Sequence, residues 1–360
     1  MKGKASLPRP RVLLRRPAHV PEKARFPVID AHNHLFDDIP AEDMTSIMDA
    51  VGVRIFVNVT GNCALPFDDR GYTIRRRDLS VYMAGWVAKR PGRFAALTMA
   101  QLARWDDFTL DLDGGFADAC VSTLEDDVRG GALGLKVTKE LGLRFHTPDG
   151  KMIAVDDRRL YPIWRRAGEL GIPVLIHTSD PVGFFLPVDE TNEHFATIRQ
   201  YPGWSFHGSY FSKWDLLDQR TRMIADHPGT MFICPHVANN PEDLEWVADL
   251  MEKHPNVHID FSARMDELGR QPYSARDFFL RFQDRVLFGS DMPISTGMYR
   301  AYFRFLESRD EYFDYPGYLG ESDNVTRWKI YGVHLPDDVL EKIYYRNALR
   351  VIPGLKGVWT

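Results

Sequence analysis

Long hydrophobic runs and cysteine are both scarce in this sequence of 360 residues. No run approaches the ~18 uncharged apolar residues that cross a bilayer, which argues against an integral membrane protein and against a membrane partner. The three cysteines, Cys63, Cys120 and Cys234, are too few and too widely spaced to form a disulfide scaffold. Reduced thiols and a cytoplasmic location are therefore expected.

An excess of charge of one sign is missing as well, since 45 basic residues nearly balance 50 acidic ones and leave a net charge of −5. This balance gives no reason to expect a nucleic-acid partner. The basic residues are concentrated at the start, where eight of the first 26 residues are Lys or Arg and Glu22 alone opposes them. Four prolines interrupt any helix there. We predict a solvated basic extension over residues 1–26, with an address or an anionic contact as the alternative, and one folded domain over residues 27–360.

Short apolar segments alternate with longer amphipathic segments along this domain. The apolar segments are nearly uniformly apolar, as expected for parallel strands that are covered on both faces. They comprise residues 27–31, 54–59, 94–99, 133–137, 173–177, 230–235, 257–261 and 285–288. The amphipathic segments have helical spacing and comprise residues 41–50, 73–89, 116–129, 158–170, 216–227, 243–254, 275–282 and 296–306. Eight such units predict an α/β protein with a single (β/α)8 barrel, the TIM-barrel fold.

Two connections are too long for a plain β/α unit. Residues 178–215 follow the fifth predicted strand, and residues 308–329 follow the eighth predicted helix. Because active sites of such barrels lie at the carboxyl ends of the strands, we expect the first connection to cover the substrate. The second leaves a helix end, so we expect it to pad the exterior, with a lid as the alternative. Residues 336–352 have the pattern of a terminal helix that caps the barrel.

The short sequence His32-Asn33-His34, directly after the first predicted strand, is the most informative pattern for function. With twelve histidines, such a pair arises by chance in about 0.4 of chains of this length, so its placement carries the argument. Residues two apart on an extended segment point the same way, which sends both imidazoles toward the barrel axis. Two nitrogen donors on one side are half of a metal site.

The ends of four other predicted strands also carry polar residues where an apolar run would otherwise continue. Lys136 ends the fourth strand, His177 the fifth and His236 the sixth, and Asp291 follows the eighth. Histidines and a carboxylate around an open position suit Zn²⁺ or a similar divalent ion, which lowers the pKa of a bound water to about 7. A histidine outside the coordination sphere polarises a carbonyl or moves a proton, and an aspartate beside the water accepts its proton.

With these motifs the sequence resembles the amidohydrolase superfamily, and within it the amidohydrolase-related branch that includes the aminocarboxymuconate-semialdehyde decarboxylase group. The resemblance rests on residues 28–36, 172–177, 285–293 and 347–350 as an ordered set. It implies one or two divalent ions, zinc first and manganese second, held by His32, His34, His177 and Asp291. It also implies that Asp291 deprotonates the water, while His236 contacts the substrate or that water.

Lys136 is the position at which branches of this superfamily divide. Members with two metals carry a carbamylated lysine at the fourth strand as a bridging ligand, which members with one metal generally lack. An unmodified lysine is a cation that would repel the metals, so Lys136 is a metal ligand only if it is carbamylated. The alternatives are a point charge that binds a substrate carboxylate and a structural ion pair, and a one-residue error in the strand register would exchange Lys136 with Lys139. Arg264, beyond the seventh strand, is a candidate substrate-binding clamp for an anion or else an ordinary loop arginine.

Three functions stay open at this point. The leading hypothesis is a metal-dependent hydrolase of a small molecule, in which metal-bound hydroxide attacks an amide, ester or lactone with Asp291 as the base and His236 as the electrophilic partner. The main alternative is a metal-dependent non-oxidative decarboxylase, and a minor one is a barrel that binds without catalysis. Homo-oligomers are common for barrels of this class, but no surface feature of the sequence predicts one.

Overall fold

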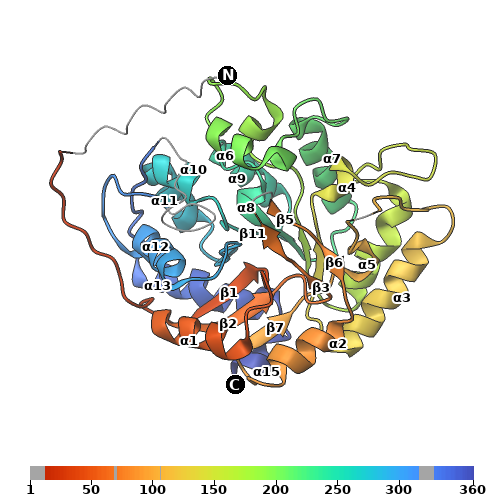
Figure 1. Ribbon diagram of the computed structural model, residues 1–360, viewed down its shortest axis with the longest axis horizontal. Helices are drawn as coiled ribbons and strands as arrows, with labels where there is room; N and C mark the ends of the chain where they lie inside the picture. The colour runs from red at the N-terminus through yellow and green to blue at the C-terminus, as the bar shows by residue number, and fades with distance from the viewer. Residues whose placement is uncertain (1–12, 69–70, 106, 316–327) are drawn as a thin grey trace.

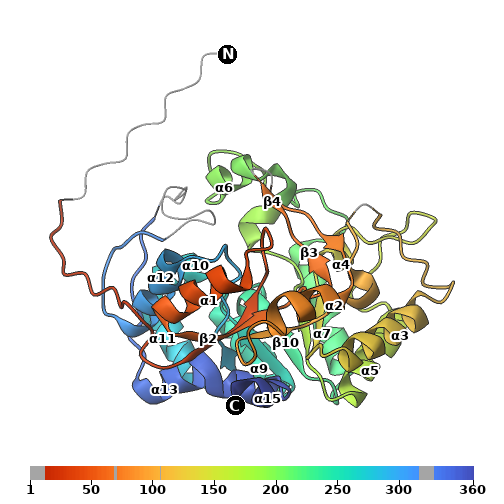
Figure 2. The same ribbon diagram turned by 60° about the horizontal axis from the view of Figure 1, so that its bottom comes forward.

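The computed structural model describes residues 13–68, 71–105, 107–315 and 328–360. Residues 1–12 of the predicted extension and residues 316–327 of the second long connection lie outside this described part. Within it, no helix is long and apolar enough to cross a membrane. Figures 1 and 2 show a group of strands at the centre with helices around it.

Eight parallel strands form this centre in two hydrogen-bonded groups. One group has the strand order β1-β2-β7 and the other has the order β12-β11-β10-β9-β8. Neighbouring strands within each group run parallel. The strands are β1 (Val28–Asn33), β2 (Val53–Asn58), β7 (Phe94–Ala96), β8 (Leu135–Val137), β9 (Val174–Ile176), β10 (Phe232–Cys234), β11 (Val257–Asp260) and β12 (Val286–Leu287).

Backbone hydrogen bonds join the two groups at both edges. Thr98, just beyond β7, donates its N–H to the carbonyl of Gly134 at 3.0 Å and accepts the N–H of Lys136 at 2.7 Å. At the other edge, the N–H of Ala31 in β1 donates to the carbonyl of Phe288, just beyond β12, at 2.9 Å. The ring of strands is therefore continuous. The predicted (β/α)8 barrel is confirmed, and each predicted strand overlaps an observed one.

Helices between the strands cover the outside of the ring (Figure 1). Their ends follow local signals. Gly52, at φ 87°, ends the first helix in a left-handed conformation that costs glycine no steric clash, and Ser212 and Asp215 form a capping box where α7 begins. The outer helices are α1 (Ala41–Val51), α2 (Leu79–Tyr82), α3 (Phe116–Arg129), α5 (Tyr161–Glu169), α7 (Lys213–Ala225), α9 (Leu244–Lys253), α11 (Pro272–Arg281), α12 (Thr296–Glu307), α13 (Asp337–Glu341) and α14 (Asn347–Val351).

Shorter helical segments lie in the connections and near the end of the chain. They matter here because several of them border the mouth of the barrel. They are α4 (Glu140–Leu143), α6 (Phe195–Gln200), α10 (Met265–Arg270), α15 (Leu355–Trp359), the 3-10 turns Ala100–Leu102, Arg158–Leu160, Val182–Phe185 and Pro202–Trp204, and the π-helical turns Met83–Val87 and Lys342–Arg346.

The interior of the barrel is filled by apolar side chains that share one cluster with the last two helices. Ile29, Val57 and Leu175 represent the strands in this cluster, and Ile352 and Leu355 come from the end of α14 and the start of α15. Strand side chains that point inward alternate with others that pack under the outer helices. The predicted terminal helix thus packs against the barrel interior.

The predicted helix over residues 73–89 is wrong before Leu79. Two short antiparallel pairs precede it instead: β3 (Cys63–Ala64) with β6 (Arg75–Arg76), and β4 (Phe67–Asp68) with β5 (Gly71–Tyr72). Asp78 caps the start of this helix, because its side chain accepts the N–H of Ser80 at 2.8 Å in the first turn. This excursion after β2 stands at the end of the molecule opposite α15 (Figure 2).

The first long connection, residues 178–215, covers the mouth of the barrel as expected. In Figure 2, α6 lies at the end of the molecule opposite α15. Phe184, Ile198 and Phe206 form a small apolar core within this connection, against which Leu143 of α4 also packs, and Phe184 and Trp204 line the pocket described below. In the second connection, Phe313 pairs with Ile330 in an antiparallel bridge, and none of its described residues lines that pocket.

The described part of the N-terminal extension runs along the outside of the molecule (Figure 1). Both the backbone N–H and Nδ1 of His19 lie 2.7 Å from the Asp310 carboxylate. Ala24 donates its N–H to the carbonyl of Val51 at 2.9 Å, and Arg25 donates its N–H to Glu307 at 3.0 Å. From His19 onward the extension is therefore bonded to the barrel. The division of the chain at residue 26 stays a prediction.

Gly289 marks the closest approach of β12 to β1, and we predict that Gly289→Ala destabilises the fold. A Cβ atom at this position would lie 2.8 Å from Cβ of His32 and 3.4 Å from Cγ of Asp260. Because both neighbours are buried, overpacking is expected to lower the free energy of unfolding by about 1–3 kcal/mol. Urea unfolding measures this change. Gly357→Ala is the matched control, since its Cβ would meet no atom within 4 Å, and equal losses in both variants would contradict the prediction.

Candidate metal centre at the barrel mouth

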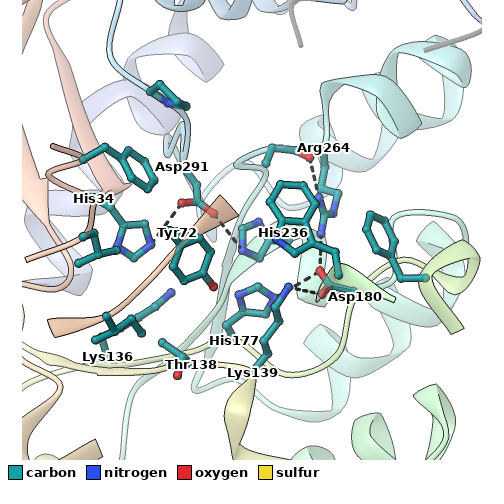
Figure 3. A pocket seen from close by; sticks show the side chains of 17 residues that line it. His34, Tyr72, Lys136, Thr138, Lys139, His177, Asp180, His236, Arg264 and Asp291 are labelled. Carbon is teal, nitrogen blue, oxygen red and sulfur yellow. Dashed lines mark hydrogen bonds and ion pairs between the residues drawn. The ribbon is translucent and has the colours of Figure 1, made fainter. Parts of the chain in front are cut away.

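The strand ends bring the predicted polar residues to one pocket (Figure 3). His34 follows β1, Lys136 lies in β8, His177 follows β9, His236 follows β10 and Asp291 lies beyond β12, and all five line the pocket. His32 lies in β1, two residues before His34. It completes the group beneath the pocket. Parallel strands place their carboxyl ends on one face of a barrel, so residues far apart in the chain meet here.

His32 is oriented by a buried carboxylate that the sequence analysis did not identify. Nδ1 of His32 lies 2.8 Å from Oδ2 of Asp260, at the end of β11. Burial raises the pKa of this carboxyl group, but His32 and the hydrogen bond from Ser262 outweigh it and hold the pKa at about 2. Asp260 is therefore an acceptor, Nδ1 of His32 carries the proton, and Nε2 presents a lone pair.

His236 and His34 are held in the same tautomer by other partners. Nδ1 of His236 lies 2.8 Å from the carbonyl oxygen of Ser262, which can only accept, so the proton is on Nδ1. Nδ1 of His34 lies 2.9 Å from the hydroxyl of Thr60, and that hydroxyl donates to Asn58. In both residues Nε2 carries a lone pair. Nε2 of His236 is buried and has no hydrogen-bond partner among the described residues.

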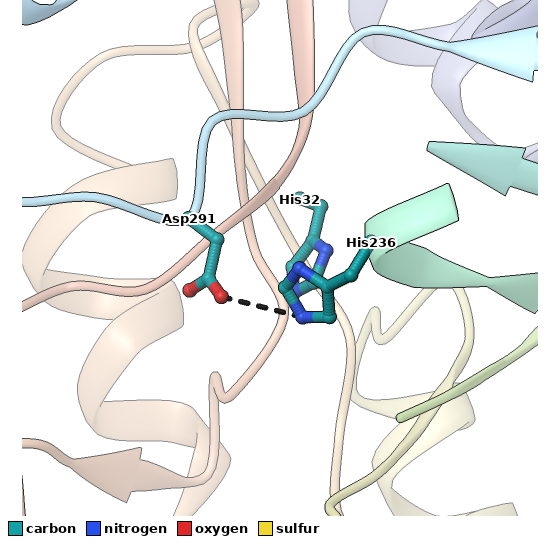
Figure 4. A group of neighbouring side chains, drawn as sticks. All are labelled: His32, His236 and Asp291. Atoms are coloured by element: carbon teal, nitrogen blue, oxygen red, sulfur yellow. Dashed lines mark ion pairs between the residues drawn. The ribbon is translucent and has the colours of Figure 1, made fainter. Parts of the chain in front are cut away.

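These lone pairs point at the carboxylate of Asp291 (Figures 3 and 4). Its Oδ1 lies 3.3 Å from Nε2 of His34, and its Oδ2 lies 3.5 Å from Nε2 of His236. Donor atoms of His32, His236 and Asp291 all lie within 4.8 Å of one another. Burial lowers the pKa of His34 and His236 well below the ordinary value, so neither imidazole brings a positive charge.

A group of acceptors around one point is unfavourable unless a cation lies among them. Burial raises the pKa of Asp291, although His32, Lys136 and Arg264 oppose this shift. A divalent ion would place further positive charge beside the carboxylate and coordinate the Nε2 atoms. The chemistry of the donor set therefore fits a metal ion such as Zn²⁺.

Lys136 reaches into this donor group. Its Nζ lies 3.1 Å from Nε2 of His32, and its side chain is buried. Burial lowers the pKa of Lys136 to about 8, against the opposing effect of Asp291 and Asp260. Nζ of Lys136 therefore lies beside the lone pair of His32 that a metal ion would use. The lysine must either move away when the ion binds or be modified so that it becomes a ligand.

His177 and Arg264 are both turned toward Asp180, a second residue that the sequence analysis missed. Nε2 of His177 lies 3.0 Å from the carbonyl of Ser179 and 3.6 Å from Oδ1 of Asp180. Nη2 of Arg264 lies 3.2 Å from the same Oδ1, and Nζ of Lys139 lies 2.6 Å from Oδ2. Arg264 lines the pocket and shares one carboxylate with Lys139, and its role as a clamp for an anionic substrate stays a prediction.

Tyr72 is a third pocket residue that the sequence analysis missed. It comes from the excursion after β2, just before the predicted helix over residues 73–89, in a stretch for which the sequence predicted neither an element nor a role. Its ring stacks on His34, with centroids 6.4 Å apart and planes at 18°. Burial, together with nearby carboxylates, raises the pKa of the phenol well above the ordinary value, so the hydroxyl is a proton donor in the pocket (Figure 3).

The backbone that carries these residues is strained. His236, Val237, Ala238 and Asn239 have φ values of 58°, 55°, 52° and 57°, so the segment Pro235–Ala238, labelled α8 in Figure 1, is a left-handed turn. Asp291 has a φ of 47°. Left-handed residues other than glycine cost roughly 1–2 kcal/mol each, and such strain gathers at functional sites.

A buried network holds the Asp291 segment against β1. Asp30 accepts the hydroxyl of Tyr299 at 2.8 Å and the backbone N–H of Ser290 at 3.0 Å. Asn33 donates to Ser290 Oγ at 2.6 Å and to the carbonyl of Met292 at 3.1 Å. Asn33, between the two histidines, and Asp30, two residues before His32, therefore fix the segment on which Asp291 lies.

Comparison with known proteins agrees with this arrangement. A model of the amidohydrolase family matches residues 23–354. Among solved structures, an uncharacterized TIM-barrel protein from Bordetella bronchiseptica is similar at 18% identity over 88% of this chain and 83% of the other, with a TM-score of 0.51. No curated protein matches this sequence.

Solved structures of both reaction types resemble the chain. A dihydroxybenzoic acid decarboxylase from Polaromonas sp. JS666, with bound manganese and the inhibitor 2-nitroresorcinol, is 14% identical over 91% of this chain and 97% of the other, with a TM-score of 0.50. A proposed 2-pyrone-4,6-dicarboxylic acid hydrolase from Pseudomonas putida is 14% identical over 92% and 98%, with a TM-score of 0.48. At 14% identity and a TM-score of 0.50, the likeness to the decarboxylase shows the fold alone, and neither structure selects a reaction.

Asp260 orients His32 and the turn of His236, and we predict that Asp260→Asn lowers metal affinity by about 10- to 100-fold. The amide is a weaker, uncharged acceptor for the proton on Nδ1 of His32. In part of the protein molecules the proton then moves to Nε2, which loses the lone pair that binds the metal. Competition with a chromophoric chelator measures the affinity for Zn²⁺. Asp249→Asn is the control, because this carboxylate is exposed on the surface of α9 and forms a long ion pair with Lys253. An unchanged affinity in folded Asp260→Asn would refute the prediction.

Proposed function

Because the chain belongs to the amidohydrolase family and histidine nitrogens converge on Asp291, we propose that it is a metal-dependent hydrolase of an amide, ester or lactone. The observation that carries the proposal is the position of the Asp291 carboxylate, whose oxygens lie 3.3 Å from Nε2 of His34 and 3.5 Å from Nε2 of His236. A carboxylate placed between a metal ligand and a second imidazole can take a proton from water and pass it on.

In this proposal, His32, His34, His177 and Asp291 hold one or two divalent ions, with Zn²⁺ and Mn²⁺ as candidates. His177 must first turn its Nε2 away from the carbonyl of Ser179. Lys136 becomes a further ligand only if it is carbamylated. The chemistry that a bound ion supplies is a water pKa near neutrality, and with it a nucleophile.

Asp291 and His236 move the proton. Asp291 accepts it from the attacking water, and Oδ2 of Asp291 lies 3.5 Å from Nε2 of His236. Because Nδ1 of His236 donates to the carbonyl of Ser262, Nε2 has a lone pair that can receive the proton. The imidazolium formed in this way keeps its hydrogen bond to Ser262 and can protonate the leaving group. His236 therefore polarises the substrate only after it has been protonated.

The rest of the pocket selects and shields the substrate. Apolar side chains from the excursion after β2 and from the covering connection form part of the lining, namely Leu65, Tyr72, Ile74, Phe184 and Trp204. Lys136 and Arg264 also line the pocket, and in this proposal they bind polar atoms of the substrate. The substrate is therefore a small molecule with an apolar face and a polar end, held where bulk water is excluded.

Metal removal is expected to abolish turnover of any hydrolysable compound found in a panel of lactones, esters and N-acyl amines. Zn²⁺ or Mn²⁺ is expected to restore it in the wild type but not in His32→Ala, which lacks a ligand. Asp291→Asn is expected to lower kcat by about 10²- to 10⁴-fold, because the base is lost. Product formation by NMR and metal content by mass spectrometry check these outcomes.

His254→Ala is the matched control, since His254 ends α9 away from the pocket. It is expected to behave as the wild type. Full metal content and full turnover in both His32→Ala and Asp291→Asn would sink the proposed mechanism. Metal binding without turnover of any compound would favour a barrel that binds without catalysis.

A decarboxylase is the second candidate, and the charges that line the pocket favour it. Lys136, Lys139 and Arg264 bring three cations, against the carboxylates of Asp180 and Asp291. A substrate carboxylate would balance this excess of positive charge. In that reaction the metal would hold the carboxylate, and a proton would be delivered to the carbon that it leaves.

Assays with hydroxybenzoic acids distinguish the two reactions. Hydrolysis is expected to incorporate one oxygen atom from H₂¹⁸O into the product of a lactone or ester and to release no carbon dioxide. Decarboxylation releases carbon dioxide, and in D₂O the product ring gains one deuterium. Carbon dioxide release with no hydrolytic activity on the panel would replace the hydrolase proposal with the decarboxylase.

A further inference from the structure

Helix α7 places two buried cations behind the candidate metal centre. Lys213 and Arg220 lie on the side of α7 that faces the barrel, and their side chains are 2% and 0% exposed. Neither lines the pocket. Buried charges are rare in protein interiors unless something depends on them, so their contacts call for an explanation.

Lys213 joins two of the segments that carry site residues. Its Nζ donates to the carbonyl of Asp180 at 2.9 Å and to the carbonyl of Asn239 at 2.6 Å. The first carbonyl belongs to the segment after β9, which follows His177. The second ends the left-handed turn that begins at His236. Glu242, 3.6 Å away, is the counter-ion.

Arg220 holds the same turn one residue earlier. Its Nη1 donates to the carbonyl of Ala238 at 2.9 Å, while Nε and Nη2 find no acceptor within the described part of the chain. A fully buried guanidinium with one hydrogen bond is costly. The carbonyl that it binds lies in the strained segment, where the backbone would otherwise leave the left-handed region.

The two segments are also joined to each other and to β11. Nδ2 of Asn239 donates to the carbonyl of Ser179 at 3.1 Å, which is the carbonyl that faces His177. At the other end of the turn, the N–H of His236 donates to Oδ1 of Asp260 at 3.0 Å. The turn is therefore fixed at its start by a carboxylate and at its end by two cations.

We propose that Lys213 is a positioning residue of the site, with Arg220 as its partner on α7. Through the carbonyls of Asp180 and Asn239, Lys213 keeps the turn of His236 in its left-handed conformation and the imidazole in the orientation that leaves Nε2 free. The inference goes beyond the proposed function, because this geometry is needed whichever reaction the site performs.

The first test is made on the metal-free full-length protein. Histidine ring ¹⁵N signals distinguish an Nδ1–H from an Nε2–H tautomer, and the His236 signal is the one that disappears in His236→Gln. The wild type is expected to show the Nδ1–H tautomer. Lys213→Met, which keeps the length of the side chain and removes its charge and donors, is expected to lose that signal or to average both tautomers.

Arg222→Met is the matched control on the same helix. Arg222 is 61% exposed and pairs with Asp156 on the surface, so it has no route to the turn. Its variant is expected to keep the His236 tautomer of the wild type. A change that appeared in both variants would show a general effect of α7 and would overturn the role of Lys213.

The second test is a titration with Co²⁺, whose visible absorption reports the ligands around the ion. Lys213→Met is expected to bind Co²⁺ about tenfold more weakly than the wild type and with a shifted band, as for other residues that orient ligands. Absence of Co²⁺ binding in the wild type would refute the proposed metal centre. The tautomer comparison would then decide by itself whether Lys213 is a positioning residue.

Three results would overturn the inference. One is a folded Lys213→Met protein whose His236 signal equals that of the wild type, and another is a wild-type signal from the Nε2–H tautomer. The third is failure of both Lys213→Met and the milder Lys213→Gln to fold while Arg222→Met folds, because Lys213 would then serve the fold rather than the site. Circular dichroism and urea unfolding establish which variants are folded.

Discussion

The buried carboxylate of Asp260 is the constraint on which the site depends. It accepts Nδ1 of His32 at 2.8 Å and the backbone N–H of His236 at 3.0 Å, so one side chain sets the tautomer of the first histidine and the path of the chain at the second. The hydroxyl of Ser262 adds a third hydrogen bond at 2.6 Å. A charged group at this depth is stable only because all of these donors meet it.

Hydrogen bonds from several elements hold the mouth of the barrel rigid. Residues in left-handed conformations follow β9, β10, β11 and β12, and a hydrogen bond from another part of the chain holds each of these segments. Asp30 and Asn33 hold the segment of Asp291 from β1, while Lys213 and Arg220 hold the turn of His236 from α7. The site is thus supported by residues that do not line the pocket. They keep the backbone in its strained conformation, because a relaxed loop would let the donor atoms move apart.

Much of this molecule could be predicted from its sequence, for reasons that differ between fold and site. Buried parallel strands leave uniformly apolar runs, and a histidine or aspartate at the end of such a run, as at His177 or Asp291, interrupts the pattern. Asp260 does not stand out in this way, because it precedes Phe261 inside the predicted strand over residues 257–261 and its role depends on a histidine from the other end of the chain. Tyr72 was missed for a different reason: it lies between the second predicted strand and the predicted helix over residues 73–89, and two short antiparallel pairs bring it to the pocket.

Closure of the barrel has a consequence for how the protein is made. β1 obtains its neighbour beyond β12 only after the chain has been synthesised past Phe288, and Ile352 and Leu355 fill the interior later still. Until then the apolar strands have no completed interior to enter, and the donor atoms of the site are not yet together. Assembly of this centre therefore follows the synthesis of β12, although its first histidines belong to β1.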